Sequence, residues 1–302
     1  MISEFFANGK LLLSGEYVVL DGALAIGLPT KLGQSLKVHQ LKSDESSVLW
    51  TAFLPNHQLW FEVSLDQDLN CIKSTDEALG ENISVILKAV KSLNPNAFTH
   101  YNLKFETHLD FPKDWGLGSS STLISLLSKF ADINAFELLN LTFGGSGYDV
   151  SCALFPKTQS YQLKSKDRKV NFIHLDAAIT KHCYFVYLNQ KQNSREGIQE
   201  YNAIEKDKTL IKSISELSSQ IISCKSLEEF EDILYVHEQL ISEFLEIPTV
   251  QDDLFPDYKH GFVKSLGAWG GDFVLVTNQN NDLSYFTRKG FDKIFAYKDF
   301  IV

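Results

Sequence analysis

The sequence predicts an α+β fold, in which strands dominate the first 110 residues and helices become frequent afterwards. Two observations carry this prediction. Residues 101–109 alternate between apolar and polar side chains, a period typical of a half-buried strand. Residues 210–221 and 227–245 instead repeat their apolar side chains every three to four positions, which indicates amphipathic helices. Because both periods occur in one chain, a mixed fold is favoured over an all-helical or all-strand one.

The other N-terminal strands are predicted from residue type. Residues 46–54 and 58–65 are rich in β-branched and aromatic side chains, and Leu54-Pro55-Asn56-His57 predicts a turn between them. The apolar run Leu11-Leu12-Leu13 predicts a buried strand, and Lys10 directly precedes this run. Two short apolar strands are expected later, at 183–188 and 273–276.

Five helices are expected where apolar residues recur at helical spacing. They cover the regions around 83–93, 119–130, 135–141, 210–221 and 226–245. The last begins with Ser226-Leu-Glu-Glu229, which predicts a capping box. No Pro/Gly-rich linker divides the chain, and the polar stretch 159–169 is the candidate junction between its two halves.

Composition excludes several classes of protein. The 302-residue chain has a formal net charge of −10, which argues against nucleic-acid binding because that needs a basic face. Its four cysteines are scattered without a C-x-x-C pair, so neither a disulfide framework nor a zinc site is expected. The same pattern predicts a reduced, cytoplasmic compartment. The first residues do not read as a signal peptide, and no apolar window predicts a membrane span.

The most informative segment is 112–121, whose last six residues read Gly-Leu-Gly-Ser-Ser-Ser. It runs into the helix predicted from Ser119, and a glycine turn before a helix start leaves backbone N–H groups free to bind an anion. No Lys follows Gly118, so the segment is not a P-loop, and Ser121 replaces the third glycine of a dinucleotide fingerprint. The residues by themselves predict either a phosphate site or an ordinary capped helix.

Four segments, taken in order, carry a resemblance to a known family. They are Asn8–Gly22, Pro112–Ser120, Gly144–Val150 and Lys264–Asp272. The second reads Pro-x-x-x-Gly-Leu-Gly-Ser-Ser, and it resembles the central motif of the GHMP small-molecule kinases, which include galactokinase, homoserine kinase, mevalonate kinase and phosphomevalonate kinase. The first and last are similar to the family's first motif and its glycine-rich third motif. Gly144–Val150 looks like the segment that carries the family's active-site Asp.

The resemblance implies a two-lobed fold. Residues 1–160 would form an ATP-binding lobe like domain 2 of ribosomal protein S5, and residues 161–302 a ferredoxin-like C-terminal lobe. The implied activity is an ATP- and Mg²⁺-dependent kinase that phosphorylates a hydroxyl or a phosphate of a small molecule, with a mevalonate-pathway metabolite as the leading acceptor. Two alternatives stay open: an ATP-dependent enzyme like diphosphomevalonate decarboxylase, and a non-catalytic binding protein on the same scaffold. No nucleic-acid or membrane partner is expected, and a homodimer is left open.

Asp149 and Lys10 are the catalytic candidates that the resemblance implies. Asp149 would orient or deprotonate the acceptor hydroxyl, and Lys10 would lower the pKa of that Asp and offset charge on the transferred phosphate. Judged from local sequence, Asp149 could equally be a turn residue that bonds its own backbone, and Lys10 a solvated surface charge.

The resemblance also implies a nucleotide and metal site. The ATP-binding candidates are Gly116, Leu117, Gly118, Ser119, Ser120 and Ser121. Ser120 would also bind Mg²⁺, with Glu137 as the second metal ligand. Leu138 occupies the position where mevalonate kinases carry that Glu, so a solvated helix residue is the alternative for Glu137.

The substrate-binding candidates lie in three segments, and they are Ser14, Glu16, Tyr17, Ser146, Gly147, Ser194 and Arg195. Mevalonate kinases usually have His where Tyr17 stands, and packing in a strand is the alternative for this ring. Ser194 and Arg195 follow a predicted strand, where they could grip a carboxylate or phosphate or simply form a polar loop. The expected glycines of the third motif are Gly267, Gly270 and Gly271. Trp269 replaces the family's middle glycine there, either as a packing residue or as one that narrows the pocket.

Overall fold

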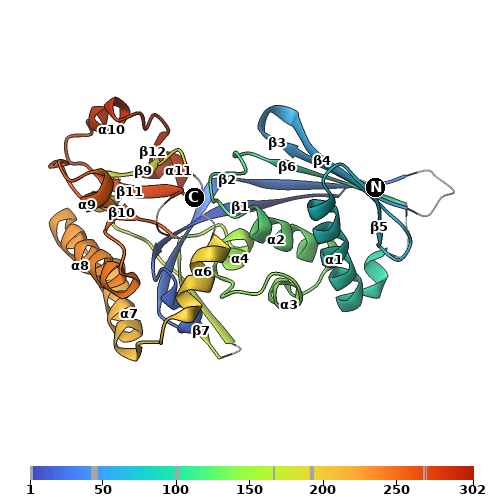
Figure 1. Cartoon of the computed structure of the whole chain (residues 1–302), viewed down its shortest axis with the longest axis horizontal. Coiled ribbons are helices and arrows are strands. Elements are labelled where there is room, and N and C mark those ends of the chain that lie inside the picture. Colours follow the sequence, from blue (N-terminus) through green and yellow to red (C-terminus); the bar gives the residue numbers. More distant parts are fainter. Residues whose placement is uncertain are drawn as a thin grey trace. The chain divides into compact units, whose positions relative to one another are not determined.

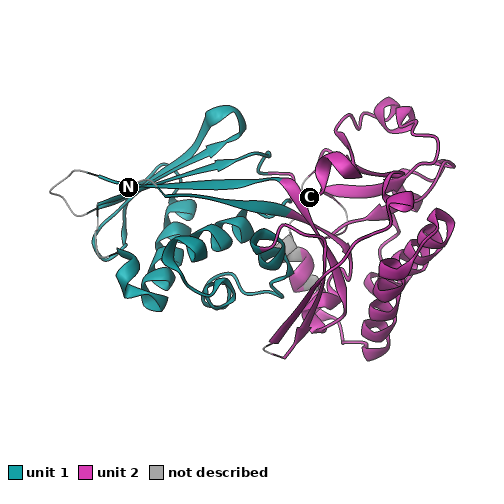
Figure 2. Ribbon diagram, turned by 180° about the vertical axis from the view of Figure 1, so that it is seen from behind, with its two compact units in different colours: residues 1–9, 32–113, 117–154 teal, residues 10–31, 114–116, 155–302 magenta. Residues whose placement is uncertain are grey.

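The long strands of this chain form because apolar and β-branched residues alternate over extended stretches, and each strand buries one face. A computed structural model describes residues 3–41, 47–98, 102–165, 167–190, 194–267, 269 and 271–302, without the side chains of 194–196 and 200. The described chain divides into two compact units (Figure 2). Unit 1 contains residues 1–9, 32–113 and 117–154, and unit 2 contains residues 10–31, 114–116 and 155–302. The strands β1 (Ser3–Ser14) and β2 (Ala25–Gln40), which pair with each other, contribute residues to both units.

Unit 1 is a sheet covered by helices. Its strand order is β5-β4-β3-β6-β2, with β3 and β6 parallel and the other neighbours antiparallel. The helices lie on one face of this sheet (Figure 1). The strands are β3 (Val48–Leu54), β4 (Gln58–Leu65), β5 (Cys71–Ser74) and β6 (Leu103–Leu109), and the helices are α1 (Glu77–Leu93), α2 (Ser119–Ala131), α3 (Ala135–Leu141) and α4 (Tyr148–Leu154).

The core of unit 1 lies between the sheet and these helices. The Trp50 ring of β3 stacks on Phe105 of β6 at 5.3 Å, and Phe130 of α2 packs edge-on against Phe105. Helix α1 buries Ile83, Ile86, Leu87 and Val90, one face at helical spacing, and Asp76 caps its first turn by accepting from the Leu79 N–H. This core fixes α2 and α4, which pack against each other.

Unit 2 contains a hairpin, a second sheet and a group of helices. Strands β7 (Gln159–Lys164) and β8 (Asp167–Phe172) form the hairpin, and β7 pairs with Ala25–Gly27 of β2. The antiparallel sheet has the order β10-β11-β9-β12. Its strands are β9 (Cys183–Tyr187), β10 (Val263–Ser265), β11 (Phe273–Thr277) and β12 (Ile294–Ala296).

The long helices of unit 2 are α6 (Ser194–Ala203), α7 (Lys208–Ser223) and α8 (Leu227–Leu245). Helices α7 and α8 pack side by side, and α8 also contacts β10 (Figure 1). Shorter helices are α5 (Ala177–Thr180), α9 (Val250–Leu254), α10 (Ser284–Arg288) and α11 (Tyr297–Phe300), and three 3₁₀ turns are η1 (Val18–Asp21), η2 (Pro55–His57) and η3 (Pro95–Phe98). No described helix is both long and apolar enough to cross a membrane.

The predicted α+β class is confirmed, and so are the five predicted helices. The polar stretch 159–169, which was predicted as the junction, contains β7 and the start of β8; its role as the junction stays a prediction. Gln159, Ser160 and Tyr161 are buried in β7, whereas β8 is largely exposed to solvent. The predicted cap of α8 is half formed, since Ser226 accepts from the Glu229 N–H while the Glu229 carboxylate accepts from the Cys224 thiol. The predicted division at residues 160/161 stays a prediction.

Candidate functional site

The Gly-Leu-Gly-Ser-Ser-Ser segment opens a helix as predicted. Gly116 and Gly118 have φ angles of +63° and +87°, a left-handed conformation that costs a glycine little. Gly118 is the N-cap of α2, and no described side chain caps that end. The first-turn N–H groups are therefore not satisfied by a side-chain cap, and the helix dipole favours a negative charge beside them.

The three serines that follow Gly118 have different surroundings. Ser121 is buried, and its hydroxyl donates to the Gly118 carbonyl at 2.9 Å. Ser119 is half-buried and Ser120 is exposed. Ser121 therefore stabilises the turn, whereas Ser120 presents its hydroxyl at the surface, where a phosphate or a cation could reach it.

Lys10, Gly116 and Asp272 come together within unit 2 from three of the four motif segments. Lys10 Nζ donates to the Gly116 carbonyl at 2.7 Å across 106 residues of sequence. A Cβ added to Gly116 would lie 1.9 Å from Asp272 Oδ2, so the Asp272 carboxylate occupies the space that the missing side chain leaves. Asp272 is itself held by β-type bonds, since its N–H donates to Gln190 and its carbonyl accepts from Leu188. The start of the 116–121 loop is thereby hydrogen-bonded to the first motif and lies against the third.

Asp149 lies in the first turn of α4 within unit 1. Its Oδ1 accepts from the N–H of Val150 at 2.9 Å, and the side chain is half-buried. The preceding Ser146 is buried, and its Oγ accepts from the Tyr148 N–H at 3.5 Å. Gly147 has a φ of +85° and accepts from the Ser151 N–H. Asp149 thus belongs to the same unit as the serines of α2, on a helix that packs against α2. Its predicted meeting with Lys10, a residue of unit 2, stays a prediction.

Glu137 lies in the first turn of α3 and is exposed, whereas Leu138 is fully buried in the core of unit 1. The one-residue offset seen in the sequence therefore separates a solvent-facing carboxylate from a core position. Among the described residues there is no cluster of three or more His, Cys, Asp or Glu side chains that could hold a metal. The role of Glu137 as a metal ligand stays a prediction.

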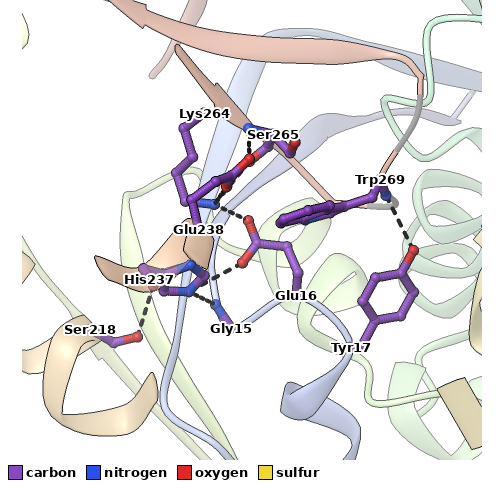
Figure 3. A network of polar contacts seen from close by, with 10 residues as sticks. Gly15, Glu16, Tyr17, Ser218, His237, Glu238, Lys264, Ser265 and Trp269 are labelled. Atoms are coloured by element: carbon purple, nitrogen blue, oxygen red, sulfur yellow. Dashed lines mark hydrogen bonds and ion pairs between the residues drawn. The ribbon is translucent and has the colours of Figure 1, made fainter. Parts of the chain in front are cut away.

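Ser14 and Glu16 point into the interior of unit 2. The Ser14 hydroxyl is hydrogen-bonded to that of Ser218 on α7 at 2.9 Å, and both Ser14 and Glu16 are fully buried. The Glu16 carboxylate binds Lys264 of β10 and lies near His237 of α8 (Figure 3). In this arrangement neither side chain is available to a ligand, because each has an internal partner.

Glu16, His237, Glu238 and Lys264 form a buried charge cluster. Lys264 Nζ approaches Glu16 Oε1 and lies 3.4 Å from Glu238 Oε2, while Glu238 Oε1 accepts from the Ser265 N–H. All four side chains are fully buried. One ammonium therefore faces two carboxylates in the interior of unit 2, where burial disfavours the negative form of each carboxyl group.

The ionisation states follow from this geometry. Burial raises the pKa of Glu16 to about 7, although Lys264 pulls it down. Burial likewise raises the pKa of Glu238. Burial by itself would lower the pKa of Lys264, but the two carboxylates outweigh it and the pKa rises. Lys264 therefore stays charged.

His237 is not a true ionic partner of Glu16, although the two side chains are only 3.3 Å apart. The N–H of Gly15 donates to His237 Nε2 at 3.1 Å, so this nitrogen carries a lone pair and no proton. Burial, with a further contribution from Lys264, holds the pKa of His237 well below its usual value.

Tyr17 connects the first motif to the third. Its hydroxyl accepts from the Trp269 N–H at 3.2 Å (Figure 3), and its ring stacks on Tyr201 of α6. Trp269 is 3% exposed, and beside it lies a cavity of about 70 Å³ that Leu188, Ile247 and Val250 also line.

The remaining predicted residues are only partly described. Ser194 and Arg195 begin α6, but their side chains are outside the described residues. Gly270 is also outside them. Gly267 has a φ of +67°, and Gly271 directly precedes Asp272.

Sequence reasoning gave no role to His237, Glu238, Lys264 or Asp272. Lys264 and Asp272 border the third motif, which is a signal that could have drawn attention to them. His237 shares a helix face with Phe230, Leu234 and Ile241, so its place in a core was readable from the period of α8. Its partners were not, because Gly15 and Glu16 lie more than 200 positions away, in the turn that follows β1.

Comparison with solved structures identifies the fold. The chain resembles the Methanococcus jannaschii mevalonate kinase, with a TM-score of 0.68 and 19% identity over 98% of this chain and 96% of the other. For the Streptococcus pneumoniae phosphomevalonate kinase the values are 0.66 and 16%, over 98% and 99% of the two chains. For the Lactococcus lactis galactokinase complexed with galactose they are 0.69 and 13%, over 97% and 92%.

Comparison of the sequence with family models and with curated proteins finds no match. The likeness therefore rests on the arrangement of the backbone rather than on overall identity. It extends over nearly the whole of each chain, and it includes members of the family that differ in substrate. The resemblance predicted from four short motifs is confirmed at the level of the fold, and the chain has the fold of the GHMP kinases.

Proposed function

We propose that this chain is an ATP-dependent kinase that transfers a phosphoryl group to a hydroxyl or a phosphate of a small molecule. The observation that carries the proposal is the loop 116–121: two left-handed glycines lead into an uncapped helix start with a surface serine. Such a start binds phosphate through backbone N–H groups and the helix dipole. Lys10 and Asp272 anchor this loop at Gly116, which is a further reason to regard it as a built site.

The proposed chemistry uses Asp149 and Lys10. Phosphoryl transfer needs positioning and charge neutralisation more than covalent help from the protein. Asp149 accepts the proton of the attacking hydroxyl or orients it, from a helix whose first turn already fixes the carboxylate. Lys10 contributes its positive charge beside the loop, where it offsets charge that grows on the transferred group.

Mg²⁺ fits this reaction because it neutralises charge on the nucleotide phosphates when bound. The exposed Ser120 hydroxyl would hold it, and the exposed Glu137 carboxylate is the second candidate. Few protein ligands are needed, since Mg²⁺ in kinases is bound largely by phosphate oxygens and water. One of the similar structures, the S. pneumoniae phosphomevalonate kinase, was solved with phosphomevalonate and AMPPNP, which supports ATP as the phosphoryl donor here.

The leading acceptor is a mevalonate-pathway metabolite. This choice rests on the first motif, Asn8–Gly22, and on the presence of both mevalonate and phosphomevalonate kinases among the similar structures. Galactokinase and a heptose phosphate kinase are also among them, so sugars belong in the same test. A diphosphomevalonate decarboxylase-like activity and a non-catalytic binding protein remain the competing functions.

The deciding experiment measures ADP release with MgATP and a panel of acceptors: mevalonate, phosphomevalonate, diphosphomevalonate, homoserine, galactose and other sugars. A kinase releases ADP with one acceptor and no carbon dioxide. Carbon dioxide released together with ADP from diphosphomevalonate would establish the decarboxylase instead. A binding protein would show a melting temperature raised by MgATP without turnover of any acceptor.

We also propose the cytoplasm as the compartment, supported by four free cysteine thiols and the acidic composition. Fractionation of the native cell tests this proposal. A homodimer is the candidate assembly, and the mass of the protein in solution tests it.

A further inference from the structure

The turn Gly15–Tyr17 has a strained backbone. Gly15 has a φ of +91°, and Tyr17 has a φ of +60° with a ψ of −53°. A positive φ at a large aromatic residue is unfavourable, and it persists only where the surroundings impose it. Strain of this kind tends to occur at functional sites.

Glu16 and Gly15 fix the turn from one side. The Glu16 carboxylate binds Lys264, and the Gly15 N–H donates to His237. Because both contacts are fully buried, they hold the backbone on either side of the Glu16 Cα. The direction in which Tyr17 leaves the turn is therefore set by the buried charge cluster.

Tyr17 fixes the turn from the other side through two further segments. Its hydroxyl accepts from the Trp269 N–H at 3.2 Å. Its ring stacks on Tyr201, and a Cβ added to Gly197 would lie only 2.8 Å from the hydroxyl oxygen. The missing side chain at Gly197 lets α6 approach the Tyr17 ring this closely.

Consecutive residues of the turn therefore contact two positions of one segment. Glu16 holds Lys264, where the third motif begins, and Tyr17 holds Trp269 within it. The same tyrosine contacts α6, the helix that begins at Ser194. The spacing between the third motif and α6 thus depends on one hydroxyl and one ring.

We propose that Tyr17 is a positioning residue for the acceptor, which sets the third motif against α6 through its hydroxyl and its ring. This inference rests on the proposed kinase function. It assigns the Tyr17 hydroxyl to the Trp269 backbone, and it gives Gly197 a role that the sequence motifs did not suggest.

The test compares Tyr17→Phe with a matched control, Tyr258→Phe. Both substitutions remove one hydroxyl from a tyrosine of unit 2, and the Tyr258 hydroxyl donates to the Thr277 carbonyl, away from the turn. Amide hydrogen exchange of a peptide that includes Trp269 needs no substrate. Tyr17→Phe should speed exchange of the Trp269 amide about tenfold or more, because this N–H loses its acceptor. Tyr258→Phe should leave the exchange rate of the Trp269 amide unchanged.

Kinetics with the acceptor identified by the panel give the second readout. Tyr17→Phe should raise KM for that acceptor about 5- to 50-fold, with KM for ATP within about twofold of the wild type. Gly197→Ala, which pushes on the ring without removing the hydroxyl, should change the acceptor KM in the same direction. Tyr258→Phe should keep both constants. A purely structural role would instead lower the melting temperature and the active fraction while both KM values stay unchanged.

Unchanged exchange at Trp269 in Tyr17→Phe would overturn the inference, and so would faster exchange with unaltered kinetic constants. A wild type that releases no ADP with any acceptor would overturn the proposed kinase function and the acceptor role with it. The exchange measurement would still decide, independently of that result, whether the hydroxyl holds the Trp269 backbone.

Discussion

The start of α2 and the buried charge cluster differ in how their polar groups meet water. At the start of α2, Ser120 is exposed and no described side chain caps the helix. In the cluster, Glu16, Lys264 and Glu238 are fully buried, and each has a partner inside unit 2. Ser120, Glu16 and Lys264 lie in segments that resemble kinase motifs, whereas Glu238 lies on α8, outside them. The difference teaches that a kinase-like motif contains two kinds of polar residue: exposed ones that a ligand can reach, and buried ones that hold the backbone in position.

The largest expected effect is a loss of turnover when Asp149 or Lys10 is substituted. Asp149→Asn keeps the oxygen that accepts from the Val150 N–H, so the fold and ATP binding should persist. Turnover should fall by about 10²–10⁴, the usual contribution of a positioned acid–base group. Lys10→Met should reduce turnover similarly, and the double variant should be barely worse than either single one, because both residues act on one transition state. Steady-state rates with the identified acceptor provide the measurement.

Two substitutions of the same type serve as controls for that prediction. Asp132→Asn changes another aspartate of unit 1, at the C-cap of α2, and Lys31→Met removes another lysine that donates to a backbone carbonyl. Both should keep near-wild-type turnover. Near-wild-type turnover in Asp149→Asn would return this residue to the role of a helix-start aspartate.

The second prediction concerns stability, with Lys264 as the probe. Lys264→Met removes the single ammonium from between two buried carboxylates and should lower the free energy of unfolding by about 3–5 kcal/mol. Lys212→Met breaks the exposed pair with Glu216 on α7 and should cost at most about 0.5 kcal/mol. Chemical denaturation measures both. Equal losses in the two variants would mean that the cluster is not a buried charge site.

The third prediction tests the loop by nucleotide affinity. Gly118→Val puts a branched side chain at a φ of +87°, where the backbone must approach a phosphate, and should weaken MgATP binding by about 100-fold or more. Gly290→Val introduces the same strain, also at a φ of +87°, at a site where no other atom lies within 4 Å of the added Cβ. Calorimetry with MgATP should show normal affinity in the Gly290 variant. Unchanged affinity in folded Gly118→Val would refute the phosphate site.

The smallest predicted effect is the pH dependence of Glu16. Its pKa is raised in the folded protein from 4.5 to about 7, so the folded state binds the proton more tightly than the unfolded state. Its contribution to stability is therefore complete below about pH 4.5 and is lost as pH rises through about 7. His237 has the opposite sign, since its lowered pKa makes stability rise with pH up to its usual value of about 6.5.

The comparison with Glu16→Gln isolates the first contribution. Between about pH 4.5 and 7 the stability of the wild type relative to Glu16→Gln should decrease by about 1–3 kcal/mol, and it should be flat at higher pH. Denaturation midpoints at several pH values provide the measurement. A wild type that gains stability relative to Glu16→Gln over this range would show that Glu16 is ionised in the folded protein.

Much of the fold could be read from the sequence because local patterns carried it. The α3 boundaries at Ala135 and Leu141 and the strand at Gln58–Leu65 were predicted from apolar spacing and residue type. The β7–β8 hairpin was missed, since an exposed, polar strand lacks the apolar alternation on which the prediction depends. The same limit applies to the cluster, where polar residues that look ligand-binding in sequence are internal.

The sequence by itself determined five helices, several strands, the loop that opens α2 and the resemblance to a kinase family, because these depend on residues close together in the chain. The tertiary structure decided which polar side chains remain open to a ligand. Glu16 and Ser120 both lie in kinase-like motifs, yet one is buried against Lys264, 248 positions away, and the other is exposed. Burial and long-range pairing set the charge and the role of each group, and neither is encoded in the neighbouring residues.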